Sequence, residues 1–155
     1  MAKNHFTARD YYTAAFERLQ ESEQLRQSKD TVILAGYTAG VSIECMLRAY
    51  GVINLAPFDK KHDLRDWLTD SGLLNSHNMA DKEAITKAVN TANRLWANDL
   101  RYYSRIRLKR TIGHEMARVK EKDHSKYFAE RNKELYQATS LIIEKGKAKW
   151  ESQKG

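Results

Sequence analysis

Residues 31–50 contain just two charged side chains, Glu44 and Arg48, in a chain in which 30% of residues are charged. Small residues alternate with large aliphatic ones along this segment, and no proline interrupts it. A stretch this long and this apolar predicts a helix that is buried around most of its circumference. We therefore expect a central helix here, surrounded by other helices and ending at Gly51 as its C-terminal cap.

The rest of the chain also shows helical periodicity. Apolar residues recur every three or four positions in several further segments, and no alternating strand pattern occurs in the sequence. The sequence predicts an all-α fold, an antiparallel bundle of about five helices, in one domain over residues 1–155 with its core at about 7–150. Besides the central helix, the expected helices cover residues 7–28, 63–71, 80–98 and a last segment from 123 or 125 to about 145 or beyond. We expect His62 and Asp63 to open the short helix at 63–71.

Nearly all of the net charge of +7 lies in residues 101–131, where ten Arg and Lys residues stand against four Asp and Glu residues. A field concentrated in this way attracts polyanions and is hard to explain by folding alone. We expect this basic segment to be partly helical, to be interrupted at Gly113, and to bind RNA or nucleotide phosphate. The residues expected to contact the nucleic acid are Arg101, Tyr102, Arg105, Lys109, Arg110, Arg118 and His124.

Some of these residues have a second interpretation. Arg101 can bind phosphate in a cleft, or it can be buried against Glu44 and lock the fourth expected helix to the central one. The sequence favours the buried role. Tyr102 and Tyr103 can stack on bases, but packing against the protein is the commoner use of such aromatic side chains.

Five short segments, in an order and spacing that cover roughly residues 7–150, resemble those of a known family. They are Tyr11-Tyr12-x-x-Ala15-x-x-x-Leu19, Ala35-Gly36-Tyr37-x-Ala39, Glu44-x-x-Leu47-Arg48-Ala49-Tyr50, Lys61-His62-Asp63-Leu64-x-x-Trp67-Leu68 and Trp96-x-x-x-Leu100-Arg101-Tyr102. Together they resemble the HEPN domain, a small all-α bundle of higher eukaryotes and prokaryotes that is named for nucleotide binding. The resemblance implies a homodimer, or a pairing of two such domains, with the active surface at the dimer cleft.

In the ribonuclease branches of the HEPN family, an Arg followed after four to six residues by a His supplies the active site. Two pairs fit this spacing, Arg107 with His114 and Arg118 with His124. His suits proton transfer near neutral pH, and Arg offers a forked set of donors to phosphate. The resemblance implies a metal-independent endoribonuclease with Arg107 and His114 as catalytic residues. The alternative is a solvated or structural role for both pairs.

The resemblance also implies a place in a toxin–antitoxin or phage-defence system, with an antitoxin or a nucleotidyltransferase as partner. A function of another class fits the same helices. In that alternative the chain is a non-catalytic dimerisation or protein-interaction module.

The sequence does not indicate a metal, a cofactor or a membrane partner. No Cys/His or Asp/His spacing suits a metal ion, and no Gly-rich phosphate loop is present. Cys45, the single cysteine, is expected to be a small buried hydrophobe rather than a reactive thiol. The sequence lacks a run of about 18 apolar residues, and its first five residues do not resemble a signal peptide. We therefore expect a cytoplasmic protein without a transmembrane helix.

Overall fold

A computed structural model of the chain describes residues 6–57, 62–120 and 122–153. Within these residues the chain forms six α-helices and three short 3₁₀ segments, and it forms no strand. The all-α prediction is confirmed, with six helices where about five were expected. In chain order the elements are α1 (Ala8–Leu25), η1 (Lys29–Thr31), α2 (Val32–Ile53), α3 (Leu64–Ser71), η2 (Leu73–Ser76), α4 (Met79–Leu95), η3 (Asn98–Tyr102), α5 (Arg105–Val119) and α6 (His124–Ser152).

Short polar side chains determine where several helices begin. The Thr7 hydroxyl accepts a hydrogen bond from the Asp10 N–H at 3.1 Å, while the Asp10 carboxylate accepts one from the Thr7 N–H at 2.8 Å. This reciprocal capping box satisfies backbone donors that the first turn leaves unpaired. Asp63 and Asp123 cap α3 and α6 in a similar way, each accepting from backbone N–H groups of the first turn.

The predicted central helix is confirmed as α2, in which fourteen residues are buried. It continues two residues past Gly51, however, so the expected cap at that glycine is wrong. Gly51 is buried inside the helix, and a Cβ there would lie 3.1 Å from the indole of Trp67. The helix ends at Ile53 with Asn54 as its C-terminal cap, and the chain turns at Leu55, whose φ is 55°.

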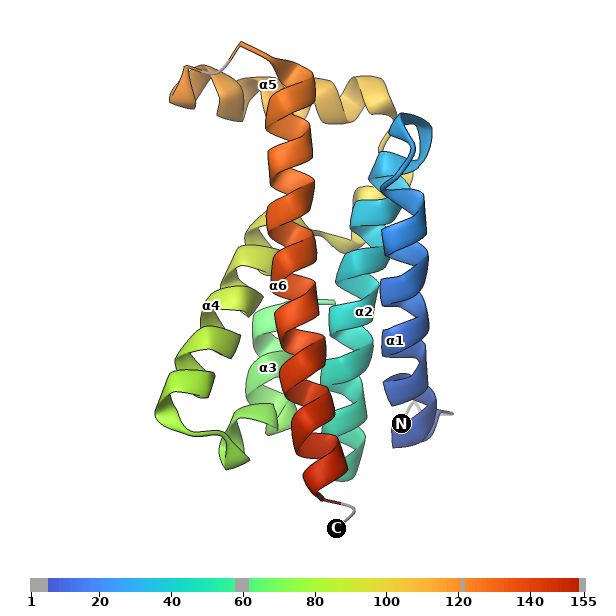
Figure 1. Ribbon diagram of the computed structural model, residues 1–155, viewed down its shortest axis with the longest axis vertical. Coiled ribbons are helices and arrows are strands. Elements are labelled where there is room, and N and C mark those ends of the chain that lie inside the picture. Colours follow the sequence, from blue (N-terminus) through green and yellow to red (C-terminus); the bar gives the residue numbers. More distant parts are fainter. Residues whose placement is uncertain (1–5, 58–61, 121, 154–155) are drawn as a thin grey trace.

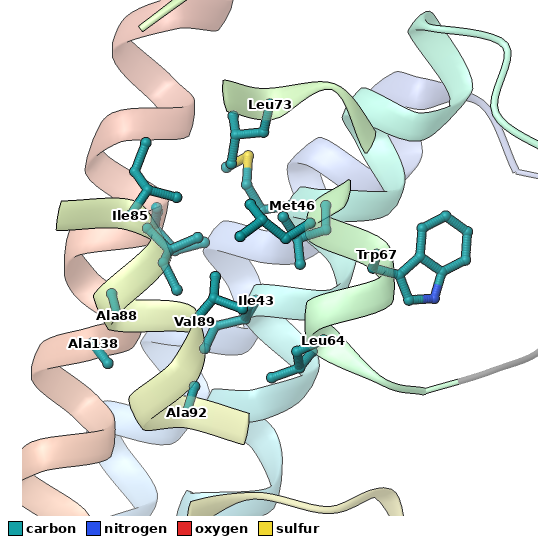
Figure 2. Packing of buried hydrophobic residues seen from close by; sticks show 14 of the residues in the cluster. Ile43, Met46, Leu64, Trp67, Leu73, Ile85, Ala88, Val89, Ala92 and Ala138 are labelled. Carbon is teal, nitrogen blue, oxygen red and sulfur yellow. The ribbon is translucent and has the colours of Figure 1, made fainter. Parts of the chain in front are cut away.

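The main core lies between α2 and the helices around it. Figure 2 shows Ile43 and Met46 of α2 facing Leu64 of α3 and Ile85 and Val89 of α4. Tyr50 of α2 is also fully buried, and its hydroxyl donates to the carbonyl of Gly146 in α6 at 2.6 Å. Because α1, α3 and α6 all pack against α2, and α4 adds side chains to the same core, that segment can be so apolar.

The helix α5 lies apart from this core and crosswise to α6 at one end of the bundle (Figure 1). It is continuous from Arg105 to Val119, so the expected interruption at Gly113 is wrong. The position of Gly113 is open, since nothing lies within 4 Å of the point where a Cβ would stand. A glycine there weakens the helix without bending it away from the bundle.

The segment Lys29–Ile53 is long and apolar enough to span a membrane by length and composition. In this structure, however, 67% of its most apolar window is buried among the other helices. That burial is also what a core helix of a bundle requires. The packing of α2 in the core therefore accounts for the length and apolar composition of this segment.

Trp96, the residue that follows α4, packs closely against α2. Its indole lies against Gly40, where a Cβ would come within 2.2 Å of three ring atoms, and its Nε1 donates to the Tyr37 carbonyl at 3.0 Å. At Gly36, one turn earlier, the nearest atoms would be 3.5 Å or more from a Cβ. A side chain at Gly40 would therefore clash with Trp96, whereas Gly36 has room for one, although both glycines lie on α2.

This difference gives a prediction about stability. We expect Gly40→Ala to lower the free energy of unfolding by roughly 1–3 kcal/mol, because the ring of Trp96 must move. Gly36→Ala is the matched control and is expected to be neutral or slightly stabilising, since alanine favours a helix by about 0.5–1 kcal/mol over glycine. Urea unfolding followed by tryptophan fluorescence measures both. Equal effects of the two substitutions would contradict the close packing at Gly40.

Candidate nucleic-acid interface

The basic segment predicted from the sequence contains the amphipathic helix α5. Ser104 caps this helix by accepting a hydrogen bond from the Arg107 N–H at 3.1 Å. Leu108, Ile112 and Met116 are buried on its inner side and form a second, smaller cluster with side chains of α2, η3 and α6. The charged side chains of α5 are therefore directed to the remaining sides of the helix.

Four of the predicted site residues share one outer side of α5. Positions 107, 110, 114 and 118 follow one another at intervals of three and four residues, which places them in one row along a helix. All four side chains are exposed. We call this row, formed by Arg107, Arg110, His114 and Arg118, the basic face. It extends over about 16 Å of helix.

The proposed catalytic residues Arg107 and His114 lie on this face but do not touch. Six residues lie between them, so the two positions are about two helical turns, or about 10 Å, apart along the axis. The Arg107 guanidinium lies 5.2 Å from the centre of the Tyr103 ring. Among the described residues, no hydrogen-bond or ion-pair partner of His114 is found. In the described part of one chain, therefore, no second group orients this imidazole for proton transfer.

The second candidate pair, Arg118 and His124, spans the turn between two helices. Arg118 lies in the last turn of α5, which ends at Val119 with Lys120 as its left-handed cap at a φ of 57°, and His124 is the first residue of α6. The exposed position of Arg118 agrees with the solvated alternative. The side chain of His124 lies outside the part of the structure that is described, and its role stays a prediction.

Arg105 and Lys109 leave α5 on another side, toward the corner between α1 and α2. The Arg105 guanidinium forms an ion pair with Asp30 at 2.8 Å, and both of these side chains are exposed. Lys109 is exposed beside it. The structure therefore divides the predicted contact residues of α5 between two surfaces.

The expectation that Arg101 is buried against Glu44 is wrong. Arg101 is exposed, with its Nη1 3.5 Å from the Tyr37 hydroxyl and its guanidinium 4.7 Å from the centre of the Tyr102 ring. The expectation that both tyrosines pack in the protein is correct for Tyr103, which joins the cluster under α5. It is wrong for Tyr102, which is 73% exposed.

Glu44 has two other partners, Arg48 and His62, and sequence reasoning missed the second of them. Its carboxylate lies 2.6 Å from Nδ1 of His62 and 3.4 Å from Nε of Arg48. The Arg48 guanidinium also lies 4.3 Å from the centre of the Trp67 ring. The pairing of Glu44 and Arg48 was predictable from their spacing of four residues. The contact with His62 depends on how the segment before α3 returns to α2, for which the sequence carries no local signal.

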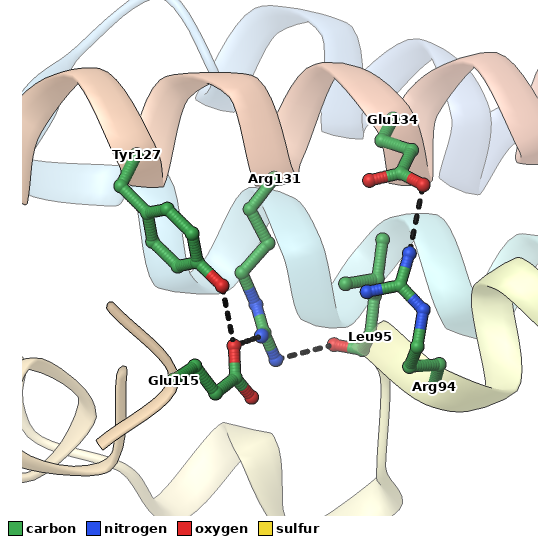
Figure 3. Close-up of polar contacts among 6 residues, drawn as sticks. All are labelled: Arg94, Leu95, Glu115, Tyr127, Arg131 and Glu134. Atoms are coloured by element: carbon green, nitrogen blue, oxygen red, sulfur yellow. Dashed lines mark hydrogen bonds and ion pairs between the residues drawn. The ribbon is translucent and has the colours of Figure 1, made fainter. Parts of the chain in front are cut away.

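A second polar cluster, also missed, ties α5 to α6 (Figure 3). Glu115 accepts hydrogen bonds from the Tyr127 hydroxyl at 2.9 Å and from Nη1 of Arg131 at 2.5 Å. Nη2 of Arg131 lies 3.4 Å from the carbonyl oxygen of Leu95 at the end of α4. Arg131 therefore serves as an internal partner of a carboxylate and is not available as a free cation. The position of Glu115, next to the apolar row of α5, was a signal for such a contact.

Two further kinds of site, a reactive cysteine and a metal site, were considered from the sequence. Burial raises the pKa of the Cys45 thiol to about 11, so this half-buried cysteine is protonated at neutral pH, as expected of a packing residue. Among the described residues, no group of three or more His, Cys, Asp or Glu side chains could hold a metal ion.

Comparisons with models of known protein families, with curated proteins and with solved structures give no match to this chain. The resemblance to the HEPN domain therefore stays a prediction from the residues quoted above.

The Glu115 cluster gives a prediction about acid. Burial by itself would raise the pKa of Glu115, but the hydrogen bonds from Tyr127 and Arg131 outweigh it and lower the pKa below its ordinary value of 4.5. Because the pKa of the folded state is the lower one, the stabilising contribution is complete above pH 4.5 and is lost as the pH falls through the folded value. We expect Glu115→Gln to cost about 1 kcal/mol at pH 7, a low value for a charged hydrogen bond because the carboxylate is partly exposed.

Urea unfolding at pH 7 and at pH 3 measures this contribution. The difference between the parent and Glu115→Gln should shrink at pH 3, where the parent carboxylate becomes protonated. Glu130→Gln, an exposed substitution on α6, is the control and should have little effect at either pH. A difference that is the same at both pH values would show that the charge of Glu115 does not hold α5.

Proposed function

We propose that the protein binds RNA or nucleotide phosphate through the basic face of α5. The observation that carries this proposal is the row of three exposed guanidinium groups along one side of a single helix, with His114 between them. No carboxylate belongs to this row. Glu115, on the same helix, is turned toward α6 and is neutralised there by Arg131. A fixed row of cations of this length matches several successive phosphates and does not require a particular base sequence.

A second candidate function is metal-independent RNA cleavage, which the position of His114 favours. Arg110 and Arg118 each lie one turn from this imidazole, so a phosphate held between them would be close to it. In the proposed reaction the 2′-hydroxyl attacks phosphorus and the bond to the 5′-oxygen breaks. A 2′,3′-cyclic phosphate forms, one group takes the proton of the 2′-hydroxyl, and another gives a proton to the leaving 5′-oxygen.

This reaction needs two groups for proton transfer, and the basic face of one chain contains one histidine. We propose that a second copy of the chain supplies the other across a two-fold axis, as the predicted homodimer would allow. In such a pairing the second copy would cover exposed apolar side chains of α5, namely Ile106 and Val119, which are 72% and 62% exposed.

RNA binding is tested by neutralising the basic face. The triple substitution of Arg107, Arg110 and Arg118 by Gln should weaken the binding of a single-stranded RNA. It should also flatten the log–log dependence on salt by about 2, since each phosphate contact contributes about 0.7. The matched control replaces Arg9, Lys87 and Lys147, three exposed cations on other helices, by Gln. If both triple variants lose the same affinity, net charge rather than the basic face is responsible.

Cleavage is tested with purified protein, mixed RNA and EDTA. We expect cleavage to survive the chelator and to leave a 2′,3′-cyclic phosphate, and light scattering of the active sample should show a dimer of the 18.0 kDa chain. The substitution His114→Ala should lower the cleavage rate by about 100- to 10,000-fold, as is usual for a general acid or base, while RNA affinity changes little. The substitution Arg107→Ala should weaken binding and cleavage together.

The outcomes of these experiments separate the candidate functions. A folded His114→Ala variant with full activity would exclude this histidine as the proton-transfer group. Binding without any cleavage by the parent would leave an RNA-binding protein. If the folded parent does not bind RNA, the alternative of a protein-interaction module replaces both proposals.

A further inference from the structure

We infer that a groove between α5 and the corner formed by α1 and α2 is a docking site for an acidic, amphipathic helical segment of a partner protein. The groove has a volume of about 430 Å³ and lies on another side of α5 from the basic face. Its walls come from the end of α1, from η1 and the start of α2, and from the first turns of both α5 and α6. The groove is thus formed by several helices together and not by one helix alone.

The floor of the groove is apolar. Leu108 and Ile112 of α5 are buried beneath it, while Val32 and Ile33 of α2 and Phe128 of α6 are half-buried in it. An amphipathic helix docks into such a floor through side chains at positions i, i+3 or i+4, and i+7. The volume of the groove is within the range of about 300–1,000 Å³ that is usual for ligand sites. It can therefore hold the apolar side chains of about two helical turns.

The rim of the groove is strongly basic. Five cationic side chains line it, and no Asp or Glu is found among its described lining residues. Asp30, close by, pairs with one of the five, Arg105. The Arg26 guanidinium lies 4.2 Å from the centre of the Tyr136 ring, which helps to hold it at the rim. The cations of the rim are Arg26, Lys29, Arg105, Lys109 and Lys133. Carboxylates on the polar side of a docked helix would be complementary to this rim.

Two other occupants fit the groove less well. Single-stranded nucleic acid binds where aromatic rings are presented to its bases. Here the floor is mainly aliphatic and Phe128, its aromatic ring, is half-buried. A second copy of this chain has a net charge of +7 and lacks the excess of carboxylates that would complement the rim, whereas the homodimer proposed above would form at the basic face, on another side of α5. An acidic partner with leucine-like anchors satisfies both the floor and the rim.

The test uses the full chain and a labelled synthetic peptide of about 14 residues. In this peptide leucines repeat at helical spacing and the other side is rich in Glu. We expect it to bind with an affinity that falls as salt rises. The double substitution of Lys109 and Lys133 by Glu should weaken it roughly tenfold or more, because two attractive contacts become repulsive. The matched control, Arg110 and Arg118 to Glu on the basic face, should leave peptide affinity within about twofold.

A scrambled peptide of the same composition separates docking from simple charge attraction. It keeps the charge but loses the apolar row, and it should bind roughly tenfold more weakly. Equal binding of the two peptides, or equal effects of the two double variants, would overturn the proposal. If the Lys109/Lys133 variant loses more affinity for RNA than the Arg110/Arg118 variant does, the groove belongs to the RNA interface instead. If the unsubstituted protein binds the peptide but does not bind RNA, that result would contradict the proposed function alone.

Discussion

The contact between Trp96 and Gly40 determines where the basic part of the chain is held. α4 ends one residue before this tryptophan, and its indole is fixed on α2 by close packing and by the hydrogen bond to the Tyr37 carbonyl. From this point the chain enters η3 and then α5. A residue with a Cβ at position 40 would displace the indole, and with it the start of the segment that carries most of the net charge. The core of the bundle and its charged surface are therefore coupled at this side chain, in addition to the contacts that attach α5 to α2 and α6.

Much of the fold could be predicted because local patterns agree with the tertiary packing. The apolar segment became the central helix, and Thr7, Asp63 and Asp123 cap helices at or within two residues of the expected starts. The errors occurred where packing outweighs local preference. Gly51 lies inside α2 because the Trp67 indole packs against it, and the helix α5 continues through Gly113 because buried residues on both sides of that position hold it.

The candidate site was predictable as a charged segment but not as a surface. Counting Arg and Lys over residues 101–131 treats all of them alike, whereas the structure gives them different roles. Arg131 neutralises Glu115, Arg105 pairs with Asp30, and Arg101 lies beside Tyr37 rather than Glu44. These partners are 16, 75 and 64 residues away in the chain, so no pattern within one helix could reveal them.

The amphipathic character of α5 also explains how one helix can present two anion-attracting surfaces without conflict. Its buried row, formed by Leu108, Ile112 and Met116, is short, so α5 depends on the Glu115 cluster as well as on apolar burial for its attachment to α6. Like charges on one side of a helix repel one another and oppose its formation. Lys109 lies on the groove side of α5, and the arginines of the basic face lie on another side. This separation of like charges lowers the repulsion. A polyanion bound to the basic face would reduce the remaining repulsion and stabilise the helix that binds it.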